Sequence, residues 1–324
     1  MMRLAAGMIS AMVLAGAAGA ARAQADWPAK PIRLVIGFPP GGALDNLARS
    51  LAPPMGRALG QSITIENRPG AGQSLAAEVV AKAEPDGYTV GLVDSGPLTV
   101  SPHLKAQGFD PAKSFVHIGT VAKLPLVLAA STASGLSTLQ DVARAARDKP
   151  GALSYASAGP ASMHNLTGEY LKGLLKVDIT HVPYKGVSQI LPDVIAGRVP
   201  LMFGGVSGTV GFIRDKQIRA IGVTSARRSV PLPDVPTLAE QGLPGFESVG
   251  WVGLSGPAGL PATVTTRLGN ALREALKDRA LYQQEVARGG NELLAGTAEE
   301  HAALFAADLA RWGRVVKEQG IRAD

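Results

Sequence analysis

Residues Ile32–Arg49 read IRLVIGFPPGGALDNLAR, and the spacing of their apolar side chains changes at the centre of the stretch. The short apolar run Leu34–Ile36 predicts a buried strand, whereas leucines and an alanine from Leu44 to Leu51 recur on one face of a helix. The turn Pro39–Gly42 separates the two elements. A strand, a tight turn and a helix in this order begin a βαβ unit, so the stretch predicts an α/β fold with parallel strands.

The Pro-Pro-Gly-Gly turn is also the first candidate binding site. It carries no bulky side chain, so the N–H groups at the start of the following helix are open to an anion such as a carboxylate or phosphate. The residues predicted to form this cradle are Pro40, Gly41, Gly42 and Ala43. Asp45 would repel an anion, and we expect it to organise the loop and helix start instead. A purely structural strand-to-helix connection is the alternative.

The same pattern returns in the second half of the chain. Leu153–Ser162 predicts a strand running into a loop of small residues, which a helix and the strand Val177–Val182 follow. Each half therefore places a loop at the carboxyl end of a strand, where ligands bind in open α/β sheets. Two such domains, face to face, would form one cleft.

The expected domains follow from this repeat. Domain 1 is discontinuous and comprises 24–123 and 248–324, whereas domain 2 comprises 124–247. Gly250–Gly259 is expected to cross between them. Within the helices, Pro53-Pro54 is expected to end or kink the first helix.

Helix starts have their own signals. Ser137 with Gln140, and Thr297 with Glu300, are predicted capping boxes. The residues that predict a packing stripe on the last helix are Phe305, Leu309, Trp312 and Val316.

Residues 1–23 are typical of a cleavable secretory signal peptide. Arg3 precedes an apolar stretch, and Ala21-Arg22-Ala23 is a small-x-small cleavage site, with Ala25 as an alternative end. No later run of about 18 apolar residues predicts a membrane span. We expect an exported protein of a bacterial periplasm.

Composition excludes several classes of function. The chain has 32 Lys and Arg against 26 Asp and Glu, but no run of five basic residues, so no nucleic-acid partner is predicted. The absence of cysteine excludes disulfides, thiolate metal sites and a cysteine nucleophile. Five histidines show no metal-binding spacing, and we expect neither a metal nor a cofactor.

Further candidate site residues lie in other loops. Gly70-Ala71-Gly72 lacks the third glycine of a dinucleotide fingerprint, so Ser74 is read as a helix cap or ligand contact. Ser157 and Ser162 could donate to a carboxylate, or could bond only within their own turn. His164 lies close to both serines, which leaves an exported serine hydrolase as an alternative, although no nucleophile elbow surrounds them.

Several short motifs are ordinary one by one, but their order along the chain is specific to one family. They are Trp27-Pro28, Phe38–Gly42 with Asp45, Glu66–Gly72, Pro85–Thr89, Tyr155–Ser157, Val182–Gly186 and Leu232–Thr237. In this order they resemble the solute-binding receptors of tripartite tricarboxylate transporters, the Bug family. The resemblance covers the chain beyond the signal peptide.

The resemblance implies a periplasmic-binding-protein-like clamshell of type II with the ligand cleft between two α/β domains. It implies a monomer that holds a small carboxylated solute without catalysis and delivers it to a membrane permease. The loops matching Pro40–Asp45 and Ser157–Asn165 would hold one ligand carboxylate, and Tyr184 lies in a further matching motif.

The chain departs from the family pattern near the expected cleft. Asn165 occupies a usual histidine position, and Gly204 replaces a common acidic residue. Asp94, followed by Ser95, stands where many relatives carry small neutral residues. An extra carboxylate would disfavour a second ligand carboxylate unless water, a cation or protonation intervenes. Met163 and Asn165 in the second loop favour a less usual ligand, so a receptor for nicotinate, an amino acid or an aromatic acid that feeds a sensor is a further alternative.

Overall fold

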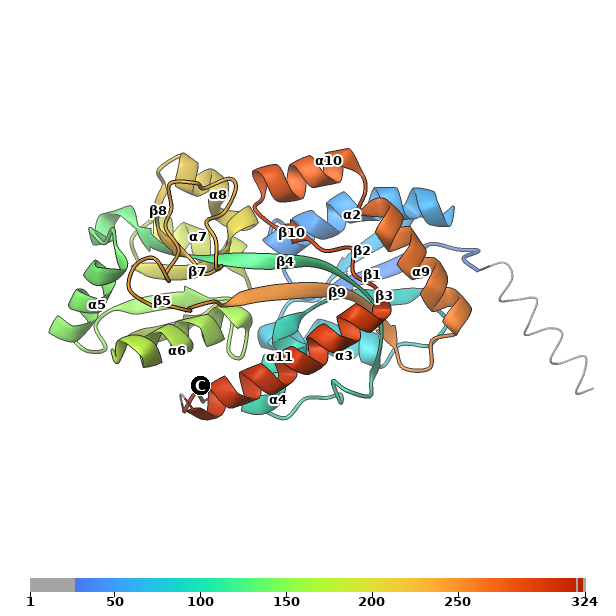
Figure 1. The fold of residues 1–324 in the computed structure, drawn as a ribbon, viewed down its shortest axis with the longest axis horizontal. Helices are drawn as coiled ribbons and strands as arrows, with labels where there is room; N and C mark the ends of the chain where they lie inside the picture. Colours follow the sequence, from blue (N-terminus) through green and yellow to red (C-terminus); the bar gives the residue numbers. More distant parts are fainter. Residues whose placement is uncertain (1–26, 319, 323–324) are drawn as a thin grey trace, which may run out of the picture.

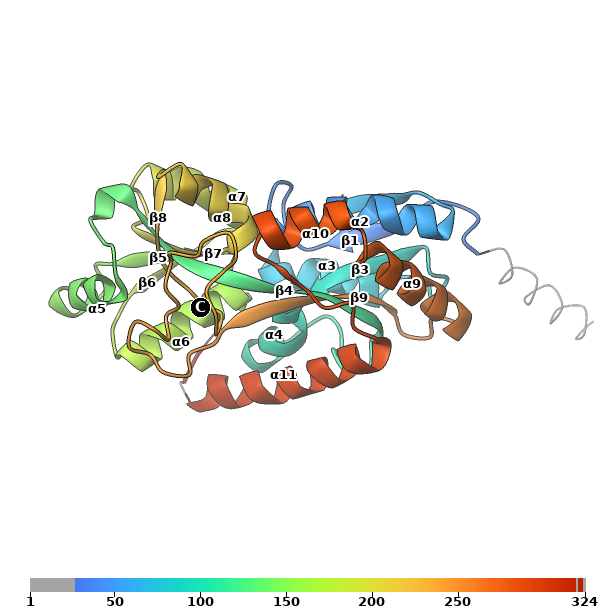
Figure 2. The same cartoon turned by 45° about the horizontal axis from the view of Figure 1, so that its top comes forward.

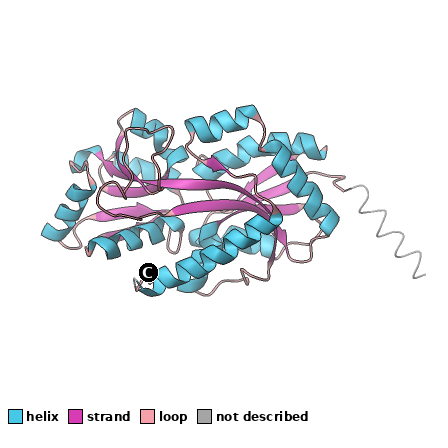
Figure 3. Cartoon of the chain, viewed as in Figure 1, coloured by secondary structure: helices cyan, strands magenta, loops and turns pink. Residues whose placement is uncertain are grey.

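A curled sheet runs the length of the molecule, with helices on both of its faces (Figures 1 and 3). The computed structural model describes residues 27–318 and 320–322, so the predicted signal peptide lies outside the described residues. The strands are β1 (Ile32–Ile36), β2 (Ile63–Asn67), β3 (Thr89–Asp94), β4 (Phe115–Ser131), β5 (Ser154–Ser157), β6 (Thr180–Pro183), β7 (Leu201–Gly205), β8 (Ile218–Val223), β9 (Val249–Pro257) and β10 (Glu292–Leu293). Their order is β2-β1-β3-β9-β4-β7-β5-β6, and β8 and β10 also pair with β4.

The helices pack against this sheet as the α/β prediction requires. They are α2 (Ala43–Leu59), α3 (Ser74–Ala81), α4 (Ser101–Leu104), α5 (Leu139–Asp148), α6 (Met163–Leu175), α7 (Val187–Ile195), α8 (Val206–Arg214), α9 (Ala262–Ala275), α10 (Arg279–Tyr282) and α11 (Ala298–Glu318). β1 pairs in parallel with both β2 and β3, and β5 pairs in parallel with both β6 and β7. Each set begins with the predicted βαβ unit, so the α/β prediction is confirmed. None of the helices in the described ranges has the length and apolar character to cross a membrane.

Two lobes result from this topology (Figure 1). The first lobe contains β1–β3, α2–α4 and α9–α11; the second contains β5–β8 and α5–α8. The long strands β4 and β9 run antiparallel to each other and join the lobes. β9 pairs with β3 of the first lobe, and β4 pairs with β7 and β8 of the second.

The crossing at Gly250–Gly259 is confirmed, because β9 covers most of it. The proposed boundary at residue 124 lies inside β4. The expected domains, 24–123 with 248–324 and 124–247, remain a prediction.

Helix α11 ties the lobes together from below (Figure 2). Trp312 and Val316 share one buried apolar cluster with Met163 and Leu166 of α6. Phe305 packs in a separate first-lobe cluster, with Leu309 partly buried beside it. The predicted stripe is therefore confirmed, and the sequence did not indicate that its second half faces the other lobe.

Helix α2 does not end at Pro53-Pro54, which was one of the two predicted outcomes. The helix continues from Ala43 to Leu59 with both prolines inside. Each proline removes a backbone donor, and a proline in a helix interior costs about 3 kcal/mol. Met55 and Leu59 beyond the prolines are buried in the first-lobe core, each contributing about 1.5–3 kcal/mol, which offsets much of that cost.

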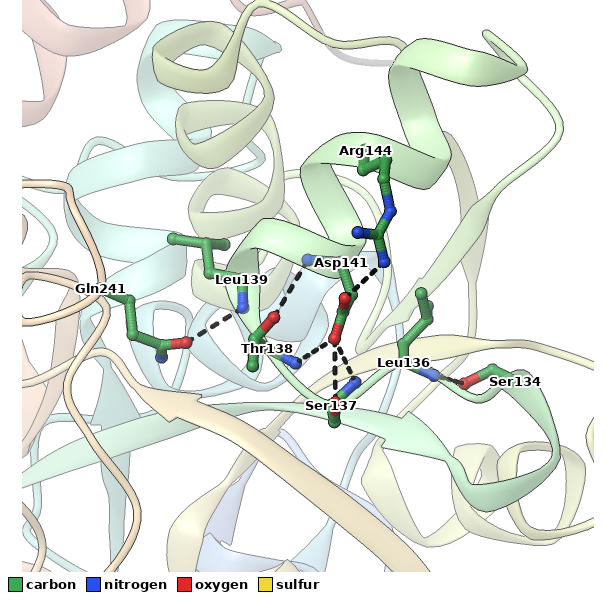
Figure 4. A network of polar contacts seen from close by, with 8 residues as sticks. All are labelled: Ser134, Leu136, Ser137, Thr138, Leu139, Asp141, Arg144 and Gln241. Carbon is green, nitrogen blue, oxygen red and sulfur yellow. Dashed lines mark hydrogen bonds and ion pairs between the residues drawn. The ribbon is translucent and has the colours of Figure 1, made fainter.

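The start of α5 differs from the prediction by one residue (Figure 4). The N-cap is Thr138, whose hydroxyl accepts from the Asp141 N–H at 3.1 Å, while Asp141 Oδ2 accepts from the Thr138 N–H at 3.0 Å. Gln140 instead donates to the Gln241 carbonyl at 2.7 Å. The error arises because a short aspartate closes this capping box as well as Glu or Gln would.

The predicted box of Thr297 and Glu300 is confirmed. The Thr297 N–H donates to Glu300 Oε2 at 2.8 Å, and the Glu300 N–H donates to Thr297 Oγ1 at 3.2 Å.

The inter-lobe cluster makes Trp312 a test of the fold. Trp312 is fully buried, so Trp312→Ala should lower the free energy of unfolding by about 3–5 kcal/mol. Tyr282→Ala is the control, because half of that side chain is exposed, and it should change stability little. Urea denaturation of both variants measures this; equal losses would contradict the assigned role of Trp312.

Candidate functional site

A narrow, largely enclosed cavity with a volume of about 20 Å³ lies between the two lobes. Its walls come from both lobes and from both connecting strands. The lining residues are Phe38, Gly42, Ala43, Leu44, Asp94, Leu124, Leu126, Met163, His164, Val187, Gly205 and Gly250. The predicted cleft therefore exists, and the Pro-Pro-Gly-Gly turn enters it through Gly42 and Ala43.

Four helices begin at this cavity. Ala43 and Leu44 start α2, Met163 and His164 start α6, Val187 starts α7, and Gly205 is the N-cap of α8. A helix N-terminus presents unpaired N–H groups and the positive end of the helix dipole. Each of these four ends favours an anion in the cavity, whose lining contains no Lys or Arg but does contain Asp94.

Three of the four helices have glycine at the N-cap. Gly42, Gly186 and Gly205 supply no side-chain cap, and the first turns of α6, α7 and α8 contain no acid. Glycine is also required by the close approach of the lobes. A Cβ on Gly205 would lie 3.1 Å from the Ala43 Cβ, and a Cβ on Gly186 would lie 2.5 Å from the Pro39 Cδ.

Asp45 organises the turn, as expected. Its Oδ2 accepts from the Gly41 N–H at 2.9 Å and from Arg49 Nε at 2.8 Å, and its Oδ1 accepts from Asn67 Nδ2 at 2.9 Å. Burial raises the pKa of Asp45, but the hydrogen bonds from Arg49, Asn67 and Gly41 outweigh burial and hold that pKa below its ordinary value.

The hydrogen bonds of Asp45 change the role predicted for Gly41, which was to donate its N–H to an anion. Gly41 adopts φ 81°, which suits glycine, and its N–H is bonded to Asp45. Pro40 is exposed at the tip of the turn and does not line the cavity. Within residues 27–318 and 320–322, the N–H groups of Ala43 and Leu44 have no protein acceptor, so the available amides lie further along the chain than predicted.

The serine loop bonds within itself, which was the alternative to ligand binding. Ser162 caps α6, accepting from the Asn165 N–H at 3.2 Å and donating to the Gly159 carbonyl at 2.6 Å. Ser157 accepts from the Gly159 N–H at 3.1 Å. Asn165 Oδ1 accepts from the Ala161 N–H at 3.0 Å. None of the three is among the residues that line the cavity, and their role in ligand binding remains a prediction.

Three other predicted residues also lie outside the cavity lining. Tyr184 donates to Asp193 Oδ2 at 2.5 Å; burial and then this carboxylate raise the pKa of Tyr184 to about 12. Ser95 accepts from the Trp251 N–H at 3.2 Å. The buried Ser74 hydroxyl has no partner within the described ranges, and Ser74 begins α3.

His164 reaches the cavity between Ser162 and Asn165. Its ring lies edge-on to Phe38 at a centroid distance of 6.1 Å, and burial lowers the pKa of His164 to about 4. The Ser157 hydroxyl contacts His181 Nε2 at 2.6 Å, not His164. From the sequence, His164 was a candidate only for a hydrolase base, whereas the structure places it in the cavity lining.

Asp94 is the one acid in the cavity lining. Its Oδ1 accepts from the Gly96 N–H at 2.8 Å. Burial raises the pKa of Asp94 to about 6, and the Gly96 bond opposes that shift. In the described part of the chain, no three His, Asp or Glu residues gather closely enough to hold a metal ion.

Residues that the sequence missed come from distant segments. Leu124 and Leu126 of β4, Val187, Gly205 and Gly250 all line the cavity. The one available signal was a glycine directly before a helical stretch, at Gly186 and Gly205. No sequence signal marked the apolar lining residues, because a leucine that lines a cavity looks the same in the sequence as any other buried leucine.

The raised pKa of Asp94 makes stability depend on pH. Asp94 ionises near pH 4 when unfolded but near pH 6 when folded, so its ionisation disfavours the folded state as pH rises between these values. Asp94→Asn keeps the Gly96 acceptor and removes this effect. The free energy of unfolding of the variant, relative to that of the natural protein, should rise by about 3 kcal/mol as the pH increases from 4 to 7. Urea unfolding across this range measures the difference; a pH-independent difference would contradict the buried, ionisable Asp94.

Comparison with known proteins places this geometry in a family. The sequence model described as "Tripartite tricarboxylate transporter family receptor" matches residues 47–321. A Pseudomonas sp. strain P51 protein, encoded between tcbD and tcbE, is 35% identical and covers 98% of this chain and 95% of its own. Protein BugT of Bordetella pertussis is 31% identical over 95% of both chains.

Solved structures are similar over nearly the whole chain. Periplasmic binding protein BugD superposes with a TM-score of 0.88 at 32% identity, covering 92% of this chain and 100% of that one. MatC from Rhodopseudomonas palustris, with bound malate, gives a TM-score of 0.85 at 31% identity, covering 90% and 100%. A second R. palustris protein, with adipate, gives 0.86 at 32% identity, covering 92% and 99%.

These similarities confirm the two-domain clamshell fold and a binding protein that is not an enzyme. They support neither the serine hydrolase nor the sensor receptor that the sequence left as alternatives. With helix N-termini converging on an inter-lobe cavity and a family match over most of its length, this chain belongs to the receptors of the tripartite tricarboxylate transporter family.

Proposed function

We propose that this protein captures a small organic acid between its lobes and delivers it to the permease of a tripartite tricarboxylate-type transporter. The convergence of four helix N-termini on one cavity carries this proposal, because such ends favour an anion. The amides of Ala43 and Leu44 would hold the ligand carboxylate. Relatives solved with adipate and with malate support a carboxylate ligand.

The apolar walls fit the carbon skeleton of such a ligand. Phe38 comes from the first lobe, Leu124 and Leu126 from the connecting strand β4, and Met163 and Val187 from the second lobe. A ligand that touches both lobes binds the closed arrangement better than an open one, and so shifts the population toward closure. One chain supplies the whole cavity, so we propose a monomer of the predicted domains 24–123 with 248–324 and 124–247.

A carboxylate should stabilise the refolded protein. Refolding removes any ligand carried through purification, and saturation at 100 times Kd should add about 2.7 kcal/mol. Thermal-shift measurements with mono-, di- and amino-substituted carboxylates test this. No shift with any carboxylate would contradict the proposed function.

Gly205→Val tests whether the cavity is the binding site. The added side chain would meet Ala43 at the start of α2 and hold the lobes apart there, so the carboxylate-induced shift should be lost. Gly211→Val is the matched control on the same helix, because a Cβ at Gly211 meets nothing within 4 Å. A shift that survives Gly205→Val would place the ligand elsewhere.

We also propose export to the periplasm through cleavage after residue 23. The signal-like composition of residues 1–23 supports this. Protein isolated from the periplasm should begin at Gln24, or at Asp26 if cleavage follows Ala25. N-terminal sequencing measures the end; an intact Met1 in periplasmic protein would contradict cleavage.

A further inference from the structure

The charge of Asp94 opposes the anion that the helix ends favour. Four helix N-termini face the cavity, yet Asp94 stands in the same lining and is only 6% exposed. The cavity is narrow, with a volume of about 20 Å³, which leaves little room for water between an occupant and the walls. Two negative charges that meet in such a buried site cannot easily both remain ionised. A ligand carboxylate and an ionised Asp94 therefore oppose each other.

No cationic group of the protein neutralises Asp94 within residues 27–318 and 320–322. Its Oδ1 accepts a hydrogen bond from the Gly96 N–H at 2.8 Å, and the carboxylate takes part in no ion pair with these residues. Its Oδ2 has no hydrogen-bond partner among them. A proton can therefore bind to Oδ2 without breaking an existing bond, and it turns that oxygen from an acceptor into a donor.

The elements packed around Asp94 place one other titratable side chain in the lining. His164, at the start of α6, has a pKa lowered by burial to about 4, so its ring is neutral at neutral pH. Asp45 of α2 lies outside the lining, and its carboxylate is bound by Arg49. The remaining described residues that line the two spaces bordered by Asp94, from β1, β4, β9, α2, α3, α7 and the N-cap of α8, are all uncharged.

We propose that the protein binds its ligand together with one proton, which Asp94 takes from solvent, and that the resulting O–H of Asp94 donates a hydrogen bond to the ligand. This inference rests on the proposed function and names the residue that makes carboxylate capture depend on pH. The new O–H bond forms on Oδ2, while Oδ1 keeps its bond from Gly96. Protonation thus removes the like charge and supplies a donor to a ligand oxygen.

The titration of Asp94 in the free protein gives the direction of the pH dependence. Burial raises the pKa of Asp94 to about 6, and the bond from Gly96 opposes that shift. An anion beside the carboxyl group raises this pKa further, because a like charge disfavours the ionised form. At pH 6 the free protein already carries part of the proton, whereas at pH 8 the proton must be taken up on binding. The affinity for the ligand should therefore fall as the pH rises above 6.

The test is isothermal titration of the refolded protein at pH 6, 7 and 8 with unsubstituted mono- and dicarboxylates, from acetate to adipate. Each titration is run in two buffers of different ionisation enthalpy, so that the difference in heat gives the number of protons taken up per ligand bound. The acid that binds most tightly should lose at least about 10-fold in affinity from pH 6 to pH 8 and should bring close to one proton with it at pH 7.

Asp94→Asn mimics the protonated acid, because the amide has the same shape, is uncharged and can donate an N–H to the ligand. The variant should bind the same acid without proton uptake and with the same Kd at pH 6 and pH 8. At pH 8 it should bind that acid at least about 10-fold more tightly than the natural protein does. Asp215→Asn is the matched control, since it removes the same charge from an exposed position just after α8, and it should keep the pH dependence of the natural protein.

His164→Gln removes the other titratable side chain of the lining and should leave the proton uptake in place. Uptake that survives Asp94→Asn would assign the proton to His164, if His164→Gln abolishes it, or to the ligand, if it does not, and either result overturns the inference. A Kd of the natural protein that is equal at pH 6 and pH 8 would also overturn it, while the carboxylate receptor stands. If no acid binds the natural protein or Asp94→Asn at any pH, the proposed function fails together with this inference.

Discussion

The convergence of four helix N-termini on one buried cavity is the constraint on which the rest of this structure depends. Each end carries unpaired N–H groups, and three of the four begin at a glycine without a side-chain cap. Bringing these ends together concentrates positive potential in a place with little water, where it acts strongly on an anion. The lobes pack around separate apolar clusters, and the helix ends meet at the cavity between them.

The connecting strands make the closure possible. β4 and β9 pair with each other; β9 also pairs with β3 of the first lobe and β4 with β7 of the second, so both lobes are built on one continuous sheet. The glycines at 186 and 205 then remove side chains that would hold the lobes apart. Close approach at these points and the absence of caps at the helix starts have the same cause, a missing Cβ.

Residue type alone does not show which polar residues face the cavity and which only hold a loop in place. Ser157, Ser162 and Asn165 look like ligand donors, yet they shape the loop that carries Met163 and His164 into the cavity. Asp45 has the same function in the first lobe, where it fixes the turn through Gly41 and Asn67. Asp94 differs from all of these, because no cationic side chain of residues 27–318 and 320–322 pairs with its carboxylate.

The sequence by itself determined the α/β class, the first βαβ unit, the crossing strand and the turn that brings Gly42 and Ala43 to the cavity. Those features depend on local periodicity and turn chemistry, which act within a few residues of one another. Only the tertiary structure decided that α2 continues through Pro53-Pro54, that Leu124 and Val187 form one wall, and that His164 faces the ligand site while Ser162 does not. These outcomes depend on packing between segments far apart in the chain, and hydroxyl groups within a loop bond to whichever partner the folded backbone brings nearest.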